Sequence, residues 1–106
     1  MTINIIRSLG SVRPFTVTDN NNNVLHQHEY GSEESVSISF DRSTVTTLYL
    51  TNLSYDPGTH GSGVLDYTIT GCSATGTSDG GYWYTLTLTD LSQEQTLNLE
   101  FSYGPI

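Results

Sequence analysis

Residues 82–89 read YWYTLTLT and residues 96–103 read TLNLEFSY. In both segments apolar and polar side chains alternate with a period of two, which is typical of a β-strand that buries one face. Only residues 90–95 separate the two segments, so we expect an antiparallel hairpin. The inner face of this hairpin is predicted to consist of Leu86, Leu88, Leu97, Leu99 and Phe101.

The same alternation continues towards the N-terminus. Further strands are predicted at residues 2–8, 12–18, 24–30, 35–40, 45–52 and 64–70. Pro14 cannot donate a backbone hydrogen bond, so it predicts an edge position for the strand at 12–18. The asparagine run at 20–23 favours a tight turn, which would join that strand to the one at 24–30 as a hairpin.

Turn residues separate the predicted strands, and no segment shows the period of a helix. Glycine-rich stretches at 56–63 and 71–81 are expected to be loops. Short strands at this spacing are typical of proteins that pack two sheets together. We therefore expect one all-β domain over residues 1–106, an antiparallel β-sandwich or jelly roll of about eight short strands.

The charge of the chain narrows its range of partners. Eleven acidic residues stand against three arginines and no lysine, which gives a formal net charge of −8. Such a charge repels phosphate backbones and anionic lipids, so neither nucleic acid nor a membrane is an expected partner. The single cysteine, Cys72, has no second cysteine with which to form an internal disulfide.

The first residues do not resemble a secretory signal. The apolar run in residues 1–6 is short and is interrupted by Asn4. No stretch of the chain approaches the roughly 20 apolar residues that a membrane-spanning helix needs. These features are compatible with a cytoplasmic protein and equally with a virion or extracellular assembly, so the compartment stays open.

His26 and His28 are two residues apart on the strand predicted at 24–30, so they should project from the same face. The run His26-x-His28-x4-Glu33 is similar to the first metal-binding motif of the cupin family, whose fold is also a small jelly roll. The resemblance implies a ligand set of His26, His28, Glu33 and His60. Asn20 stands where the motif has a glycine, and the glycine after its glutamate is absent. We therefore expect Val24, His26, His28 and Tyr30 to form a partly exposed strand face, with transition-metal binding as the alternative.

Loop oxygens could in principle bind Ca²⁺, because Asp19 precedes four asparagines and Asp56 and Asp79 lie on predicted loops. The spacing of a calcium-binding loop is absent, so we interpret Asp19 and the asparagines as turn residues. No G-x-S-x-G motif is present either. We expect neither a cofactor nor enzymatic activity.

Trp83 is the only tryptophan of the chain. If Leu86 and Leu88 face inwards, Trp83 faces outwards. An exposed indole beside hydroxyl groups is a platform on which a sugar ring can stack. The candidate ligand-binding or interface residues are Tyr82, Trp83, Tyr84, Thr85, Thr87, Asp79 and His60. Alternatively, Trp83 covers an end of the sandwich or packs against a neighbouring subunit.

The sequence is compatible with two functions, which belong to different classes of protein. A lysine-free β domain rich in Ser, Thr, Gly and Asn, without a catalytic motif, is compatible with a structural subunit of a virion, fibre or surface assembly, acting as a homo-oligomer. The strands at 2–8 and 96–103 are the candidate edges for pairing with a neighbouring copy. A carbohydrate-binding module or lectin that uses Trp83 to hold a glycan is the alternative, and a cupin-like metal-binding protein is a more distant one.

Overall fold

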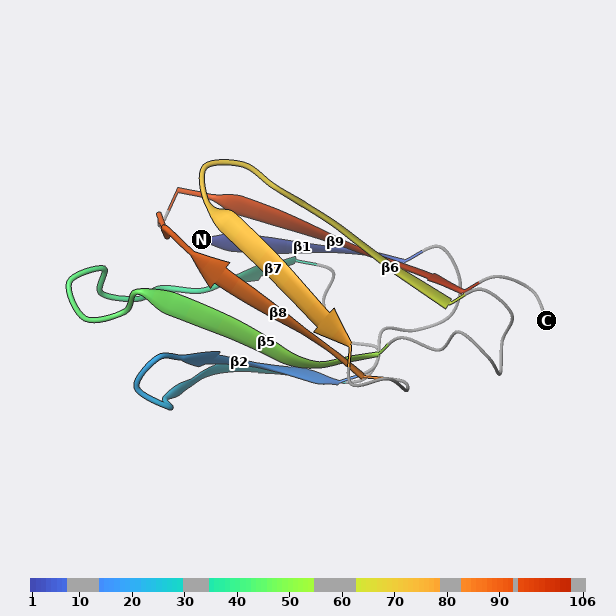
Figure 1. Ribbon diagram of the computed structural model, residues 1–106, viewed down its shortest axis with the longest axis horizontal. Coiled ribbons are helices and arrows are strands. Elements are labelled where there is room, and N and C mark those ends of the chain that lie inside the picture. Colours follow the sequence, from blue (N-terminus) through green and yellow to red (C-terminus); the bar gives the residue numbers. More distant parts are fainter. Residues whose placement is uncertain (8–13, 30–34, 55–62, 79–82, 93, 104–106) are drawn as a thin grey trace.

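The computed structural model describes residues 1–7, 14–29, 35–54, 63–78, 83–92 and 94–103, and these residues form nine β-strands and no helix (Figure 1). The strands are β1 (Thr2–Arg7), β2 (Phe15–Asp19), β3 (Val24–His28), β4 (Ser35–Ser37), β5 (Thr47–Ser54), β6 (Gly63–Ile69), β7 (Ser73–Ser78), β8 (Trp83–Thr89) and β9 (Thr96–Tyr103). None of the described residues belongs to a helix that could cross a membrane. The predicted all-β sandwich is confirmed.

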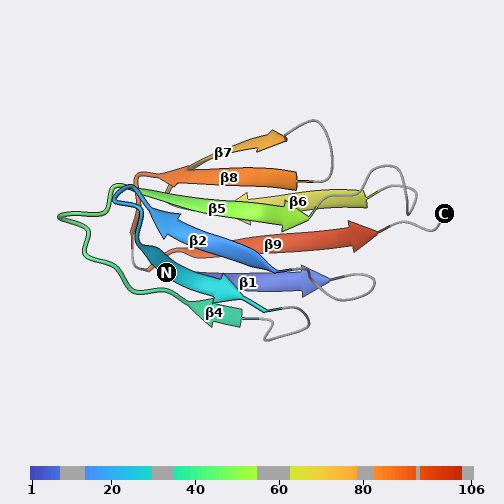
Figure 2. The ribbon, with the colours of Figure 1, turned by 90° about the horizontal axis from the view of Figure 1, so that it is seen from below.

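The strands form two sheets that pack against each other (Figures 1 and 2). One sheet has the order β4-β1-β9-β6, and the other has the order β3-β2-β5-β8-β7. The described strand pairs are antiparallel except for β1 and β9, which run parallel. The core between the sheets consists of Met1, Ile3, Ile5, Phe15, Val17, Val36, Ile38, Phe40, Val45, Leu48, Leu50, Leu53, Leu86, Leu88, Leu91, Leu97 and Leu99.

The predicted C-terminal hairpin is wrong, although its inner face is largely right. β8 pairs with β5 and β7, whereas β9 pairs with β1 and β6 in the opposite sheet. The connection therefore passes from one sheet to the other at the exposed Asp90, whose φ is +57°, and at the buried Leu91. Alternation shows which face of a strand is buried but not which strand lies beside it. The predicted inner-face residues Leu86, Leu88, Leu97 and Leu99 are each 0% exposed, and the side chain of Phe101 is outside the described part.

The stretch at 71–81, predicted to be a loop, contains β7. Its glycines misled the prediction, because of the two that are described only Gly71, with φ of +83°, lies outside a strand. Gly76 lies within β7, where a Cβ atom would overlap the phenol of Tyr84 on the neighbouring strand. A glycine inside a strand thus marks a close approach here and not a break in the strand.

The edges of the sheets also differ from the prediction. β2 lies between β3 and β5, and Pro14 precedes its first residue instead of interrupting its ladder. β1 and β9 are both internal strands, so the prediction that residues 2–8 and 96–103 form sheet edges is wrong. β4 pairs with β1 at Thr2–Asn4, and β6 pairs with β9 from Leu97 to Tyr103. The edge strands are β3 and β7 in one sheet and β4 and β6 in the other.

In two strands an extra residue interrupts the alternation of inward-facing and outward-facing side chains. On β5, the pairing with β8 shifts between Leu50 and Leu53, and Asn52 there has a φ of +63°. On β3, the pairing with β2 shifts so that Leu25 is the extra residue between Val24 and His26. Each shift is a β-bulge, which moves the following side chains to the opposite face.

Candidate functional site

The outward face of the five-stranded sheet carries a uniform set of side chains, which we call the threonine face. Its members alternate with the buried core residues of their strands and are half-buried or exposed. They are Val24, Gln27, Thr16, Thr18, Thr47, Tyr49, Thr51, Thr85, Thr87, Thr89, Ser73, Thr75 and Thr77. On β2 and β8 the members are threonines that alternate with inward-facing apolar residues, whereas β5 adds Tyr49 and β3 adds Val24 and Gln27.

The strand register aligns these side chains in rows that cross the sheet. In the central row, Val24 lies opposite Thr18, Thr18 opposite Tyr49, Tyr49 opposite Thr87, and Thr87 opposite Thr75. The row therefore crosses the whole sheet, with Tyr49 at its middle. Neighbouring strands are about 4.8 Å apart, so hydroxyl groups recur at that spacing on either side of the Tyr49 ring.

The thirteen residues of the threonine face include no acidic residue and no arginine. Asp19 is on β2, but its side chain is buried on the opposite side of the strand. The exposed carboxylate of Asp90 lies at the margin of the face, where it accepts a hydrogen bond from the Ser73 hydroxyl.

The predicted ligand-binding residues are divided between the two sides of β8. Thr85 and Thr87 belong to the threonine face, whereas Tyr84 packs against the core and over Gly76. The backbone of Trp83 pairs with Ser54. The side chain of Trp83, as well as Tyr82, Asp79 and His60, lies outside the described residues. The sequence analysis did not include Tyr49 among the candidate residues. Its place between Leu48 and Leu50, which face the core, indicates that it faces outwards and could have identified it.

His26 and His28 do lie together, but they face inwards. His26 Nε2 is 3.4 Å from His28 Nδ1, a hydrogen-bonding distance. The His28 ring is 2% exposed and stacks on Phe15 with 4.8 Å between centroids. The predicted partly exposed strand face is therefore corrected, because the bulge at Leu25 turns His28 into the core.

Two residues of the cupin-like set, His26 and His28, lie within the described part of the chain. Within the described residues, no group of three or more His, Cys, Asp or Glu side chains could hold a metal ion. The other two residues of the cupin-like set, Glu33 and His60, lie outside those residues. Stacking on Phe15 and the hydrogen bond to His26 assign His28 a packing role in the core.

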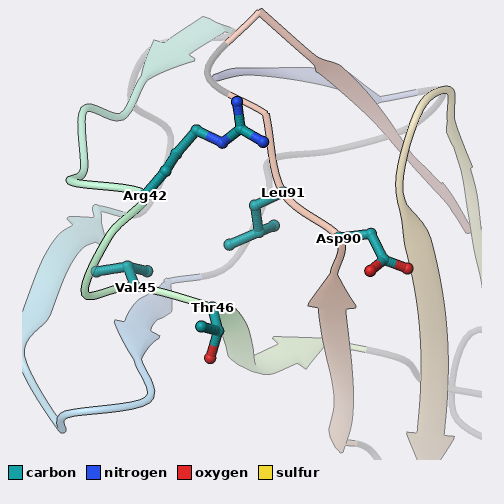
Figure 3. A pocket seen from close by; sticks show the side chains of 5 residues that line it. All are labelled: Arg42, Val45, Thr46, Asp90 and Leu91. Carbon is teal, nitrogen blue, oxygen red and sulfur yellow. The ribbon is translucent and has the colours of Figure 1, made fainter.

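The loop at 41–46 and the start of the β8–β9 connection enclose a shallow hollow at one end of the sandwich (Figure 3). Its floor is apolar, since Val45 and Leu91 are each 6% exposed. Arg42 and Asp90 lie on opposite sides of Leu91 and do not point toward one another. The Asp90 carboxylate accepts a hydrogen bond from the Ser73 hydroxyl at 3.1 Å, which holds the chain crossing in place. These contacts stabilise the fold and assemble no catalytic arrangement.

The asparagine run after β2 is a turn, as predicted, and Asp19 organises it. The Asp19 carboxylate accepts hydrogen bonds from the backbone N–H groups of Asn23 and Asn21 at 2.9 and 2.8 Å, and from the Asn23 side chain at 3.1 Å. The Asn20 side-chain oxygen in turn accepts the backbone N–H of Thr46 at 2.9 Å. This turn therefore anchors the loop at 41–46, and the carboxylate oxygens of Asp19 are used within the turn.

We expect Asp19 to make the fold sensitive to acid. The hydrogen bonds donated by Asn23 and Asn21 lower the pKa of Asp19 below its ordinary value of 3.8. Its contribution to stability is complete above that value and is lost as the pH falls through the lower pKa of the folded state. Thermal melting between pH 7 and pH 2 should therefore show a fall in Tm that is smaller in Asp19→Asn than in the wild type. The exposed carboxylate of Glu94 provides the control, and an equal change in Glu94→Gln would contradict this role for Asp19.

Neither the protein-family models, nor the curated proteins, nor the solved structures contained a match.

Proposed function

We propose that this chain is a non-enzymatic structural subunit that associates with copies of itself by strand addition at β7. The observation that carries the proposal is the composition of this edge strand. β7 reads SATGTS and contains no charged residue and no proline. Its pairing with β8 is continuous from Ser73 to Ser78, without a bulge.

An edge strand of this kind is a template for another strand, because one row of its N–H and C=O groups has no partner strand. Proteins that remain monomeric protect such edges with lysine, proline, bulges or very short strands. Within the described residues no strand lies beyond β7, which forms one margin of the five-stranded sheet (Figure 2). β7 has none of these protective features.

The other edges are better protected. β4 has only three residues, β3 contains the bulge at Leu25, and β6 carries Asp66. β7 is the one described edge that is long, regular and neutral. Pairing with a second copy about a twofold axis would join the two five-stranded sheets into one continuous sheet.

The sequence also predicts a lectin or a cupin-like metal-binding protein. A lectin site centred on Trp83 depends on a side chain outside the described residues. A cupin-like metal site depends on Glu33 and His60, which are outside them as well. Neither has an observation comparable with the neutral edge of β7.

Lysines placed on β7 should weaken association. In Thr75→Lys/Thr77→Lys, four lysines would meet across a twofold interface, and their repulsion should weaken association by at least about tenfold. The matched control is Thr44→Lys/Thr46→Lys, which makes the same change in net charge at exposed threonines of the loop at 41–46, away from the edge strands. Sedimentation velocity over a wide concentration range measures the effect.

The expected result is an oligomer fraction that grows with concentration in the wild type and in the control, but not in the β7 variant. A wild-type chain that sediments as a monomer at every concentration would contradict the proposal. Equal association of the β7 variant and the wild type would also contradict it.

A further inference from the structure

We infer that the Tyr84 phenol makes β7 selective for a second β7 strand, so that assembly stops at two copies. This inference rests on the proposed strand addition at β7, and it names the partner strand, the residue that selects it and the end point of assembly. The observations that carry it are the position of Tyr84, the residue types of β7, and the larger inward side chains of the other described edges.

The Tyr84 side chain reaches from β8 to the margin of the sheet. The backbone of Tyr84 pairs with Ser78, but the phenol lies over Gly76, two positions away on β7. The phenol oxygen is the atom nearest to the place where a Cβ atom of Gly76 would stand. Because β7 is an edge strand, the end of the Tyr84 side chain fills the inward side of the sheet at the point where a further strand would join.

A strand added at β7 should therefore place a small residue opposite Gly76. Residues directly opposite each other on antiparallel strands have their Cβ atoms about 4.5–5.5 Å apart and on the same face of the sheet. At Gly76 the phenol occupies the position of that Cβ atom and the space around it. A large side chain opposite Gly76 would have to displace the phenol, whereas a glycine, alanine or serine would not.

Twofold symmetry gives β7 a small residue at this position in each register. When two antiparallel strands pair, directly opposite residues point to the same face and direct their hydrogen-bonding groups either both towards or both away from each other. In a pair of identical strands, Gly76 can then lie opposite only a residue an even number of positions away. Within β7 these residues are Ala74, Gly76 and Ser78, which are all small. β7 is therefore complementary to itself.

The other described edge strands carry large residues on the inward side. On β3 Leu25 packs against the core, on β6 Tyr67 and Ile69 do so, and on β4 Val36 is buried. Pairing β7 with β3 or β6 along its length would bring one of these side chains against the Tyr84 phenol. A contact between two different edges repeats from copy to copy and builds an open fibre, whereas a β7–β7 contact uses the same edge of both copies and closes.

Disulfide cross-linking identifies the partner strand. Thr75→Cys/Thr77→Cys is prepared together with Cys72→Ser, so that the only thiols of the chain are on β7. A symmetric register centred on residue 75, 76 or 77 brings two of these thiols directly opposite each other, within the distance that a disulfide spans. We expect mild oxidation to convert most of the associated protein into covalent dimers.

The matched control places the same two thiols away from the edge strands. Thr44→Cys/Thr46→Cys, also with Cys72→Ser, changes two exposed threonines of the loop at 41–46. Little covalent dimer is expected in this control. An equal yield in the two variants would show that the thiols react through random collisions, and it would overturn the assignment of β7 as the partner strand.

Variants of Tyr84 test its role in selecting the partner strand. Tyr84→Phe keeps the ring over Gly76, so it should still stop at two copies. Tyr84→Ala removes the ring, and β7 should then also accept strands with large inward residues. Species larger than a dimer should therefore appear as the concentration of Tyr84→Ala rises. A Tyr84→Ala variant that associates but never exceeds two copies would overturn the selective role of Tyr84.

Light scattering on the wild type gives the end point of assembly. The monomer has a mass of 11.6 kDa, and we expect the measured mass to rise with concentration and to level off at twice this value. A mass that continues to rise would overturn the inference and leave the proposed self-association intact. Association that Thr75→Lys/Thr77→Lys weakens, but that yields no cross-link through β7, would do the same. A wild-type chain that remains a monomer would refute the proposed self-association itself.

Discussion

Leu53→Ala is expected to lower the free energy of unfolding by about 2–5 kcal/mol, the usual cost of emptying a leucine site in a core. Leu53 is 0% exposed. Strict alternation from Leu48 and Leu50 would instead place position 52 in the core and position 53 in solvent. The bulge at Asn52 reverses this order, because its φ of +63° inserts one residue into the strand.

Substitutions at Asn52 provide the contrast. Asn52→Gly should change the free energy of unfolding by less than about 1 kcal/mol, since glycine adopts a positive φ readily. Asn52→Val should cost about 1–3 kcal/mol, because a β-branched residue is strained in that conformation. Urea denaturation of the three variants measures these differences. A small effect of Leu53→Ala together with a tolerated valine at position 52 would show that β5 continues without a bulge.

Gly76→Val is expected to cost about 1–3 kcal/mol through overpacking. A Cβ atom at this position would overlap the phenol of Tyr84, which itself packs against the core. The Tyr84 ring must then move away and lose its contacts with the inner face of β7 and β8. Exposed threonine positions on the same strand, such as Thr75, have no such neighbour on the inner face, so Thr75→Val should change stability by less than about 0.5 kcal/mol.

A double-mutant cycle separates this overlap from other effects of the substitution. In the Tyr84→Ala background the space over Gly76 is empty, so Gly76→Val should cost clearly less than in the wild type. The expected coupling is about 0.5–3 kcal/mol, which is the range for residues in direct contact. Equal costs in the two backgrounds, measured by chemical denaturation, would contradict the packing of Tyr84 over β7.

Periodicity predicted the fold class and much of the core because burial of one strand face is a local property. Leu86, Leu88, Leu97 and Leu99 were assigned to inner strand faces, and each is 0% exposed. The turn at Asp19 was predictable for the same reason, since its hydrogen bonds join residues within four positions of each other.

Strand partners could not be predicted, because they depend on contacts that are distant in sequence. β9 pairs with β1, at the other end of the chain, instead of with β8. The two bulges, at Leu25 and at Asn52, were equally hidden, because a single extra residue does not alter composition. β7 was missed because a glycine and small polar residues resemble a loop until Tyr84 is placed above them.

The candidate site residues also divide into those that one strand reveals and those that only the pairing of strands reveals. Thr85 and Thr87 were found because they alternate with leucines on one strand. Their neighbours Tyr49, Thr18 and Thr75 come from three other strands, so only the register reveals the threonine face. His26 and His28 were correctly placed side by side, but their inward direction depends on the bulge in β3.

Amide hydrogen exchange at low and high protein concentration tests the central claim, the addition of strands at β7, most directly. Amides of residues 73–78 that point away from β8 should exchange rapidly in dilute solution and become protected as the concentration rises. Amides at the other edges, in β3, β4 and β6, should exchange at the same rate throughout. Exchange in β7 that is independent of concentration, or concentration-dependent protection at one of those edges instead, would contradict the account.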